Sequence, residues 1–117
     1  MNRWWRLYRT SLGRHVVKEE IQDLGRDAKG AVTEAMKRHT RGHLFPYEEE
    51  HIRGDIHAIR IFHDGSTYRL VYAYEGNSDQ VLLGLHCIQK KGRKLPQQAL
   101  RTAERRLRDW RSRGSGR

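Results

Sequence analysis

The sequence predicts a single α+β domain with an N-terminal strand, a helical hairpin, an antiparallel meander of three strands and a C-terminal helix. An Asp-Gly pair at residues 64–65 separates two segments rich in Ile, Val, Leu and Tyr, which is typical of a tight β-hairpin. Apolar residues recur at helical spacing in residues 17–36 and again after Pro96. A chain of 117 residues has room for one modest core. We therefore expect one domain over residues 1–111 and a disordered basic tail over residues 112–117.

The first half of the chain contains the predicted strand and helical hairpin. Residues 3–9 alternate in character, as a short strand does, and the apolar residues of 17–24 have i, i+4, i+7 spacing, which predicts a helix that ends at Gly25. Asp27 is the expected N-cap of a second helix. The apolar side of that helix consists of Ala31, Val32, Ala35 and Met36. Residues 41–54 lose this periodicity and contain a proline and an acidic run, which indicates a loop.

The hairpin around residues 64–65 has a register that follows from its turn. If His63 pairs with Ser66, then Arg60 lies directly opposite Arg69. Two like charges in this arrangement cost a few tenths of a kcal/mol to about 1 kcal/mol. The pair therefore favours an anion-binding site, although two solvated arginines on an open face are the alternative.

The second hairpin of the meander has a less decisive turn. Pairing Tyr72 with Leu83 keeps one face of the sheet apolar and places His86 in one row with the two arginines. The strand period of two then puts Lys90 on the same side as His86, at the rim of the sheet. The meander is thus predicted to carry basic side chains along one face of the sheet.

The positive charge of the chain is concentrated at its C-terminal end. The formal net charge is +10, and residues 88–117 hold 11 of the Lys and Arg residues but only two of the Asp and Glu residues. The helix predicted after Pro96 has an apolar stripe made of Pro96, Ala99, Leu100, Ala103, Leu107 and Trp110, and a basic side with Arg101, Arg105 and Arg108. Such a field suits a polyanion such as RNA or DNA, and a solubilising tail is the alternative.

The cationic cluster has the groups that RNA cleavage through the 2′-hydroxyl requires. That reaction needs a base for the hydroxyl, cations for the crowded phosphorane and an acid for the departing 5′-oxygen. Arginine suits charge stabilisation, whereas His86 or a lysine at 90 or 91 suits proton transfer. The candidate catalytic residues are Arg60, Arg69, His86, Lys90 and Lys91. The candidate RNA contacts are Arg93, Lys94, Arg101 and Arg105.

Several other classes of protein lack support in the sequence. The seven histidines form no HExxH or Cys/His arrangement, so we expect no metal or other cofactor. There is no phosphate-binding glycine loop and no serine-nucleophile elbow. The single cysteine, Cys87, is expected to be a core residue. No apolar run is long enough to span a membrane and the N-terminus lacks the apolar core of a signal peptide, so the expected location is the cytoplasm.

The ordered motifs resemble those of the RelE and HigB toxins of type II toxin-antitoxin systems, particularly the phage-derived HigB-like branch. HAIRI, the hairpin and YRLVY are similar to that family's arginine-bearing strand pair. LLGLHCIQKKGRKLP is similar to its segment of leucine, histidine, paired lysines and proline before the last helix, which here contains ALRTAERRL. The resemblance covers most of the chain.

The resemblance implies a RelE-like fold and a toxin that cleaves messenger RNA, usually in the ribosomal A site and without metal. It also implies a cognate antitoxin, often with a helix-turn-helix domain. Arg69 matches the family's active-site arginine, Arg60 matches a basic position, and Lys90 and Lys91 fall near its late basic catalytic residue. The chain departs from some members because no tyrosine follows Tyr74, which leaves open the group that stacks on the base and the identity of the general base. The alternative function is a non-catalytic phage-derived module that binds nucleic acid or protein on the same fold.

Overall fold

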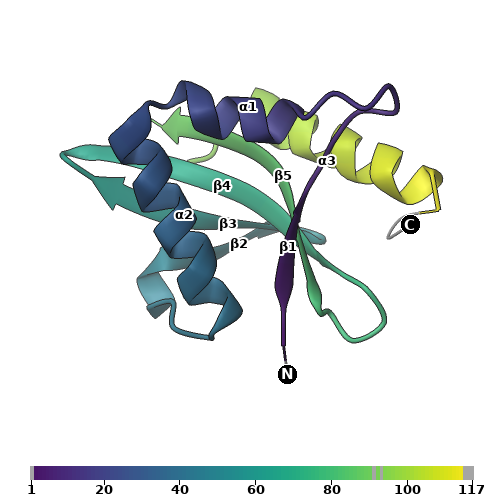
Figure 1. The fold of residues 1–117 in the computed structure, drawn as a ribbon, viewed down its shortest axis with the longest axis horizontal. Helices are drawn as coiled ribbons and strands as arrows, with labels where there is room; N and C mark the ends of the chain where they lie inside the picture. Colours follow the sequence, from purple (N-terminus) through teal and green to yellow (C-terminus); the bar gives the residue numbers. More distant parts are fainter. Residues whose placement is uncertain (1, 91, 93, 115–117) are drawn as a thin grey trace.

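The computed structural model describes residues 2–90, 92 and 94–114, and its elements follow the predicted α+β order (Figure 1). These elements are β1 (Trp4–Leu7), α1 (Val16–Asp23), α2 (Arg26–Thr40), a 3-10 helix η1 (Pro46–Glu48), β2 (Glu49–Arg53), β3 (Ile56–His63), β4 (Ser66–Glu75), β5 (Val81–Lys90) and α3 (Gln97–Ser112). The α+β prediction is confirmed, including the N-terminal strand, the helical hairpin, the meander and the C-terminal helix.

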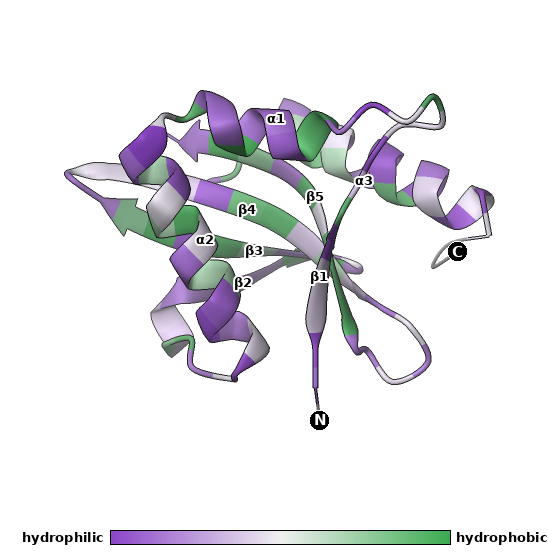
Figure 2. Ribbon diagram, viewed as in Figure 1, coloured by the Kyte–Doolittle hydropathy of each residue, from purple (hydrophilic) through white to green (hydrophobic). Residues whose placement is uncertain are grey.

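The strands form one mixed sheet in the order β1-β5-β4-β3-β2, in which β1 runs parallel to β5 and the other neighbours are antiparallel. Helices α1 and α2 lie in front of this sheet in Figure 1, and α3 lies behind β5. Both faces of the central strands are buried, because Ile59 and Leu70 on one face and Ala58 and Val71 on the other are all 0% exposed. Figure 2 shows the same division, with hydrophobic strands in the centre and hydrophilic positions on the outer sides of the helices.

The hairpin between β3 and β4 has the predicted register. His63 pairs with Ser66 and Arg60 pairs with Arg69. The intervening turn has positive φ at both of its central residues, 49° at Asp64 and 76° at Gly65, as the tight hairpin turn requires.

The predicted register of the second hairpin is wrong. Tyr72 pairs with Gly84 rather than Leu83, and Val71 pairs with His86. The pairing shifts between these two positions because Leu85 has no partner on β4, so β5 contains a β-bulge. The residue opposite Arg69 is consequently Ile88 and not His86. The single row of two arginines and a histidine does not form.

Residues 41–54 are more ordered than the loop that the sequence predicted. The acidic run instead forms the end of η1 and the start of β2, an edge strand that pairs with β3. Glu49 lies opposite Ile59 and Glu50 lies opposite Ala58. The loop prediction was wrong for β2. The strand is mostly polar and pairs with a single neighbour at the edge of the sheet, so it lacks the apolar pattern that would have predicted a strand.

The helices follow the predicted apolar stripes with one difference at an N-terminus. Helix α1 ends at Asp23 with Gly25 in the expected positive-φ position, but α2 begins at Arg26 with Gly25 as its N-cap, so Asp27 lies within the first turn. In α3 the predicted stripe is buried apart from Pro96, which is the N-cap. None of the helices in the described part of the chain has the length and apolar character needed to cross a membrane. The first residue of the predicted tail, Ser112, is the last residue of α3, and residues 115–117 lie outside the described residues.

Candidate nucleic-acid site

Two arginines from neighbouring strands converge on one carboxylate from the edge strand. The Arg60 guanidinium donates a hydrogen bond from Nη2 to Oε2 of Glu50 at 2.8 Å, and Arg69 donates from Nε to Oε1 at 2.8 Å. The side chain of Arg69 is 4% exposed, that of Glu50 19% and that of Arg60 36%. Only Arg60 presents a large part of its side chain to solvent. The three residues share the face of the sheet on which Ala58 and Val71 lie, opposite α2.

Glu50 is a site residue that the sequence analysis missed. The sequence placed the acidic run in a loop, and nothing in its local pattern pointed toward Arg60 and Arg69. Burial raises the pKa of the Glu50 carboxyl, but the hydrogen bond from Arg60 and the positive charges of both arginines outweigh that effect and hold the pKa below its ordinary value. Glu50 is therefore ionised at neutral pH, and each of its carboxylate oxygens accepts a hydrogen bond from one of the arginines.

Lys90 is the second proton-transfer candidate of this cluster. It lies at the end of β5, two residues beyond the partner of Arg69 and on the same face, and its side chain is buried, with 4% of the residue exposed. Its ammonium group donates a hydrogen bond to the carbonyl of Gly92 at 2.6 Å. Burial lowers the pKa of Lys90 below its usual value, and the charge of Arg69 acts in the same direction. The structure thus brings Lys90 to the two arginines, as the sequence predicted.

His86 lies apart from this cluster. It is on the same face of the sheet but two residues back along β5 from the position opposite Arg69, which is about 7 Å along a strand. Its Nδ1 lies 2.9 Å from Oε1 of Glu20 on α1, and Arg106 of α3 contacts the same carboxylate at 2.9 Å. His86 therefore joins β5 to two helices in this structure.

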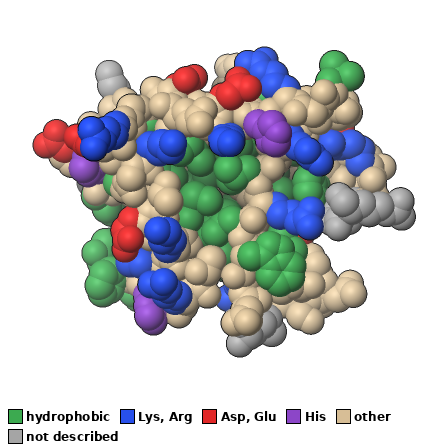
Figure 3. All heavy atoms as spheres, in the orientation of Figure 1, with side chains coloured by type: hydrophobic (Ala, Val, Ile, Leu, Met, Phe, Trp, Pro, Cys, Tyr) green, Lys and Arg blue, Asp and Glu red, His purple; other side chains and the backbone are tan. Residues whose placement is uncertain are grey.

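The remaining predicted residues lie around the end of β5 and on α3. Lys94 is exposed after the strand, and Arg101 and Arg105 are exposed on α3. Lys91 and Arg93 lie outside the described residues. On the opposite face, covered by α1 and α2, Lys and Arg side chains are dispersed, and hydrophobic side chains are visible between the helices (Figure 3).

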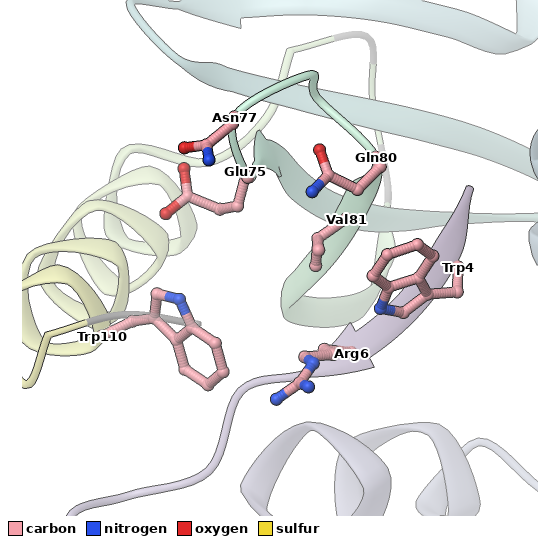
Figure 4. A pocket seen from close by; sticks show the side chains of 8 residues that line it. Trp4, Arg6, Glu75, Asn77, Gln80, Val81 and Trp110 are labelled. Atoms are coloured by element: carbon pink, nitrogen blue, oxygen red, sulfur yellow. The ribbon is translucent and has the colours of Figure 1, made fainter. Parts of the chain in front are cut away.

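A pocket of about 240 Å³ occupies the other end of the sheet (Figure 4). It lies between β1, the turn before β5 and the end of α3, and Trp4, Arg6 and Trp110 are among its lining residues. The indole nitrogen of Trp110 is buried and has no hydrogen-bond partner among the described residues. None of the predicted site residues lines this pocket, so it is separate from the candidate site.

The fold and the cluster together define a small α+β protein with a cationic site suited to a phosphate diester, since paired guanidinium groups match phosphate oxygens and an adjacent carboxylate and amine can move protons. Among the described residues, no group of three or more His, Cys, Asp and Glu side chains is arranged to hold a metal ion. The expectation of metal-free chemistry stays a prediction.

A comparison with protein families matches residues 19–108 to the family described as phage-derived protein Gp49-like (DUF891). The chain belongs to this family, which is toxin-like and of the RelE/HigB type. No curated protein matches the chain. The resemblance found in the motifs is therefore supported at the level of the family.

Proposed function

We propose that this protein is the toxin of a toxin-antitoxin pair, a metal-independent endonuclease that cleaves messenger RNA and inhibits translation. The observation that carries the proposal is the convergence of Arg60 and Arg69 on Glu50, with Lys90 buried beside them. This cluster contains two guanidinium groups, the kind of cation that suits phosphate, together with one ionised carboxylate and one amine of lowered pKa. Membership of the Gp49-like family supports the same reading.

The proposed reaction is an attack of a ribose 2′-oxygen on the neighbouring phosphorus. Glu50 accepts the 2′-hydroxyl proton as the O2′–P bond forms, and Arg60 and Arg69 donate hydrogen bonds to the equatorial oxygens of the phosphorane. Lys90 gives a proton to the 5′-oxygen as the P–O5′ bond breaks. The products are a 2′,3′-cyclic phosphate and a free 5′-hydroxyl, so atoms and charge balance without a further reactant.

The roles proposed for the surrounding residues are those expected from the sequence, and the residues within the described part of the chain are exposed. Arg101 and Arg105 on α3 contact the phosphates of the RNA strand on either side of the cleaved bond, as Lys94 does after β5. Lys91 and Arg93 remain candidates by sequence alone. The proposed setting is the cytoplasm, with the ribosome presenting the message, as the resemblance to the RelE and HigB toxins implies. The proposed inhibitor is a cognate antitoxin with a helix-turn-helix domain.

One observation favours a second function, which is nucleic-acid or protein binding without cleavage. The two arginines already share a carboxylate in the free protein, and the side chain of Arg69 is almost fully buried. A site closed in this way is also what a purely structural ion pair would look like. In that case the exposed arginines of α3 would supply the binding surface.

The Lys90→Met variant separates the two functions. Methionine keeps a long apolar side chain at a buried position but carries no proton, so the fold is retained while the proposed acid is lost. We expect wild-type expression to arrest growth and to produce message fragments with 2′,3′-cyclic phosphate ends, and we expect Lys90→Met to remove both effects. Lys29→Met on the exposed side of α2 is the matched control and should behave as wild type. Intact message with the wild-type protein, or unchanged cleavage by Lys90→Met, contradicts the proposal.

A further inference from the structure

Three aromatic side chains form an exposed group beside the candidate site. Phe45, Tyr47 and Phe62 are 56%, 60% and 57% exposed. The rings of Phe45 and Tyr47 are stacked, with centroids 5.6 Å apart and planes 4° apart, and the Tyr47 ring lies 6.3 Å from that of Phe62. Figure 3 shows hydrophobic side chains at the left edge of the molecule, over the segment between α2 and β2. Exposure of three neighbouring rings is costly in water and is typical of a surface that binds a partner.

The segment that carries two of these rings is held firmly in place. Glu48, only 6% exposed, accepts two hydrogen bonds of 2.7 Å from the guanidinium of Arg38 on α2. Its Oε1 also accepts a hydrogen bond of 2.8 Å from the backbone N–H of Phe45. Both rings are therefore positioned before any partner binds, which reduces the entropy lost on binding.

The third ring is placed by the same hairpin that places the arginines. Phe62 pairs with Thr67, and Thr67 pairs with Lys90 on the next strand. The row from Phe62 to Lys90 therefore lies next to the row that contains Arg60 and Arg69, on the same face of the sheet. Two residues of an antiparallel strand span about 7 Å, so Phe62 lies within about the length of one nucleotide from a phosphate bound at Arg60.

We propose that Tyr47 and Phe62 form a stacking platform for a nucleobase of the single-stranded RNA whose phosphate is bound by Arg60 and Arg69. This inference rests on the proposed function and adds the element that the missing late tyrosine left open. Flat rings beside a cationic row are the combination used to bind single-stranded nucleic acid, in which bases stack and phosphates pair with cations. A pocket of about 340 Å³ lies behind the rings on the side of α2, where Arg38 and Ile61 help to line it, and it is separate from the face that carries the two arginines.

The test measures binding to a fluorescein-labelled single-stranded RNA hexamer with 2′-O-methyl riboses, which cannot be cleaved through the 2′-oxygen. Fluorescence anisotropy at low salt is recorded for wild type, Phe62→Leu and Tyr47→Leu. Leucine keeps an apolar side chain but removes the ring, and both positions are exposed, so the fold is retained. Trp4→Leu removes an exposed ring at the opposite end of the sheet and is the matched control.

Loss of base stacking should weaken binding about 5- to 150-fold in each ring variant and leave Trp4→Leu unchanged. Binding to an abasic oligonucleotide of the same length should not differ between wild type and the ring variants. Arg69→Met should weaken binding to both oligonucleotides. Unchanged hexamer affinity in Phe62→Leu and Tyr47→Leu, with Arg69→Met still defective, overturns the platform alone and leaves the rings to a protein partner. Unchanged affinity in Arg69→Met overturns the phosphate site on which the platform depends.

Discussion

Replacing Glu50 with glutamine should destabilise the fold, because the negative charge that faces Arg69 is lost while the guanidinium stays buried. Breaking a buried ion pair by removing one partner costs about 3–5 kcal/mol. Arg60 is partly exposed and therefore screened by water, so we expect the lower end, about 3 kcal/mol. With an unfolding entropy of roughly 0.25 kcal/mol per degree for a chain of this length, the melting temperature should fall by about 12 °C.

A double-mutant cycle by urea unfolding, followed by tryptophan fluorescence, measures this coupling. Adding Arg69→Met to Glu50→Gln should recover part of the loss, with a coupling energy of about 1–3 kcal/mol. Glu104→Gln is the matched control, since it breaks a more exposed pair with Arg53 and should cost less than about 1 kcal/mol. If the two site substitutions are additive within about 0.5 kcal/mol, the carboxylate does not hold the arginine electrostatically and the reasoning fails.

Three further predictions concern the rest of the fold. Hydrogen bonds from Arg38 hold the pKa of the Glu48 carboxyl below its unfolded value of about 4.3. The stabilising contribution of Glu48 is therefore complete above that pH and is lost as the pH falls through the folded pKa. Between about pH 5 and pH 3, wild type should lose more stability than Glu48→Gln, and equal losses would contradict this. Burial raises the pKa of Cys87 to about 12, so iodoacetamide at pH 8 should label the thiol only after unfolding, as mass spectrometry would show. Gly84→Ala places a Cβ 2.7 Å from Cδ2 of Leu7, so the Leu7 side chain must move, and the unfolding free energy should fall by about 1 kcal/mol. An unchanged urea midpoint would show that this side chain moves aside without cost.

The part of the site that the sequence could predict is the part set by a local turn. The backbone has positive φ at both Asp64 and Gly65, and this turn geometry fixes which residue of β3 pairs with which residue of β4 without any tertiary information. The opposition of Arg60 and Arg69 followed from that count alone. The longer turn before β5 does not fix a register, and the predicted pairing of Tyr72 was wrong by one residue. The bulge at Leu85 shifted the pairing by a further residue.

Glu50 was missed for a different physical reason. Its position depends on β2, an edge strand with one neighbour and little apolar surface, so neither alternation nor composition distinguishes it from a loop. Pairing of β2 with β3 is a non-local event that brings the carboxylate diagonally toward Arg60. Lys90, by contrast, was predicted on the correct face even though the register was wrong. The misplaced pairing and the bulge each shifted β5 by one residue against β4, and a total shift of two residues returns each side chain to the same face.

The dual contact of Glu50 with both arginines also predicts how the proposed reaction responds to pH. In the free protein these arginines lower the pKa of the carboxyl. When a phosphate takes over their hydrogen bonds and adds its own negative charge, the pKa of Glu50 should rise, which makes it a better base when the 2′-hydroxyl is in place. The acid limb of kcat, which reports the bound complex, should therefore lie at higher pH than the acid limb of kcat/KM, which reports the free protein. Cleavage rates measured from about pH 4 to pH 8 test this order. Coincident limbs, or an acid limb retained in a residually active Glu50→Gln variant, would show that another group accepts the proton.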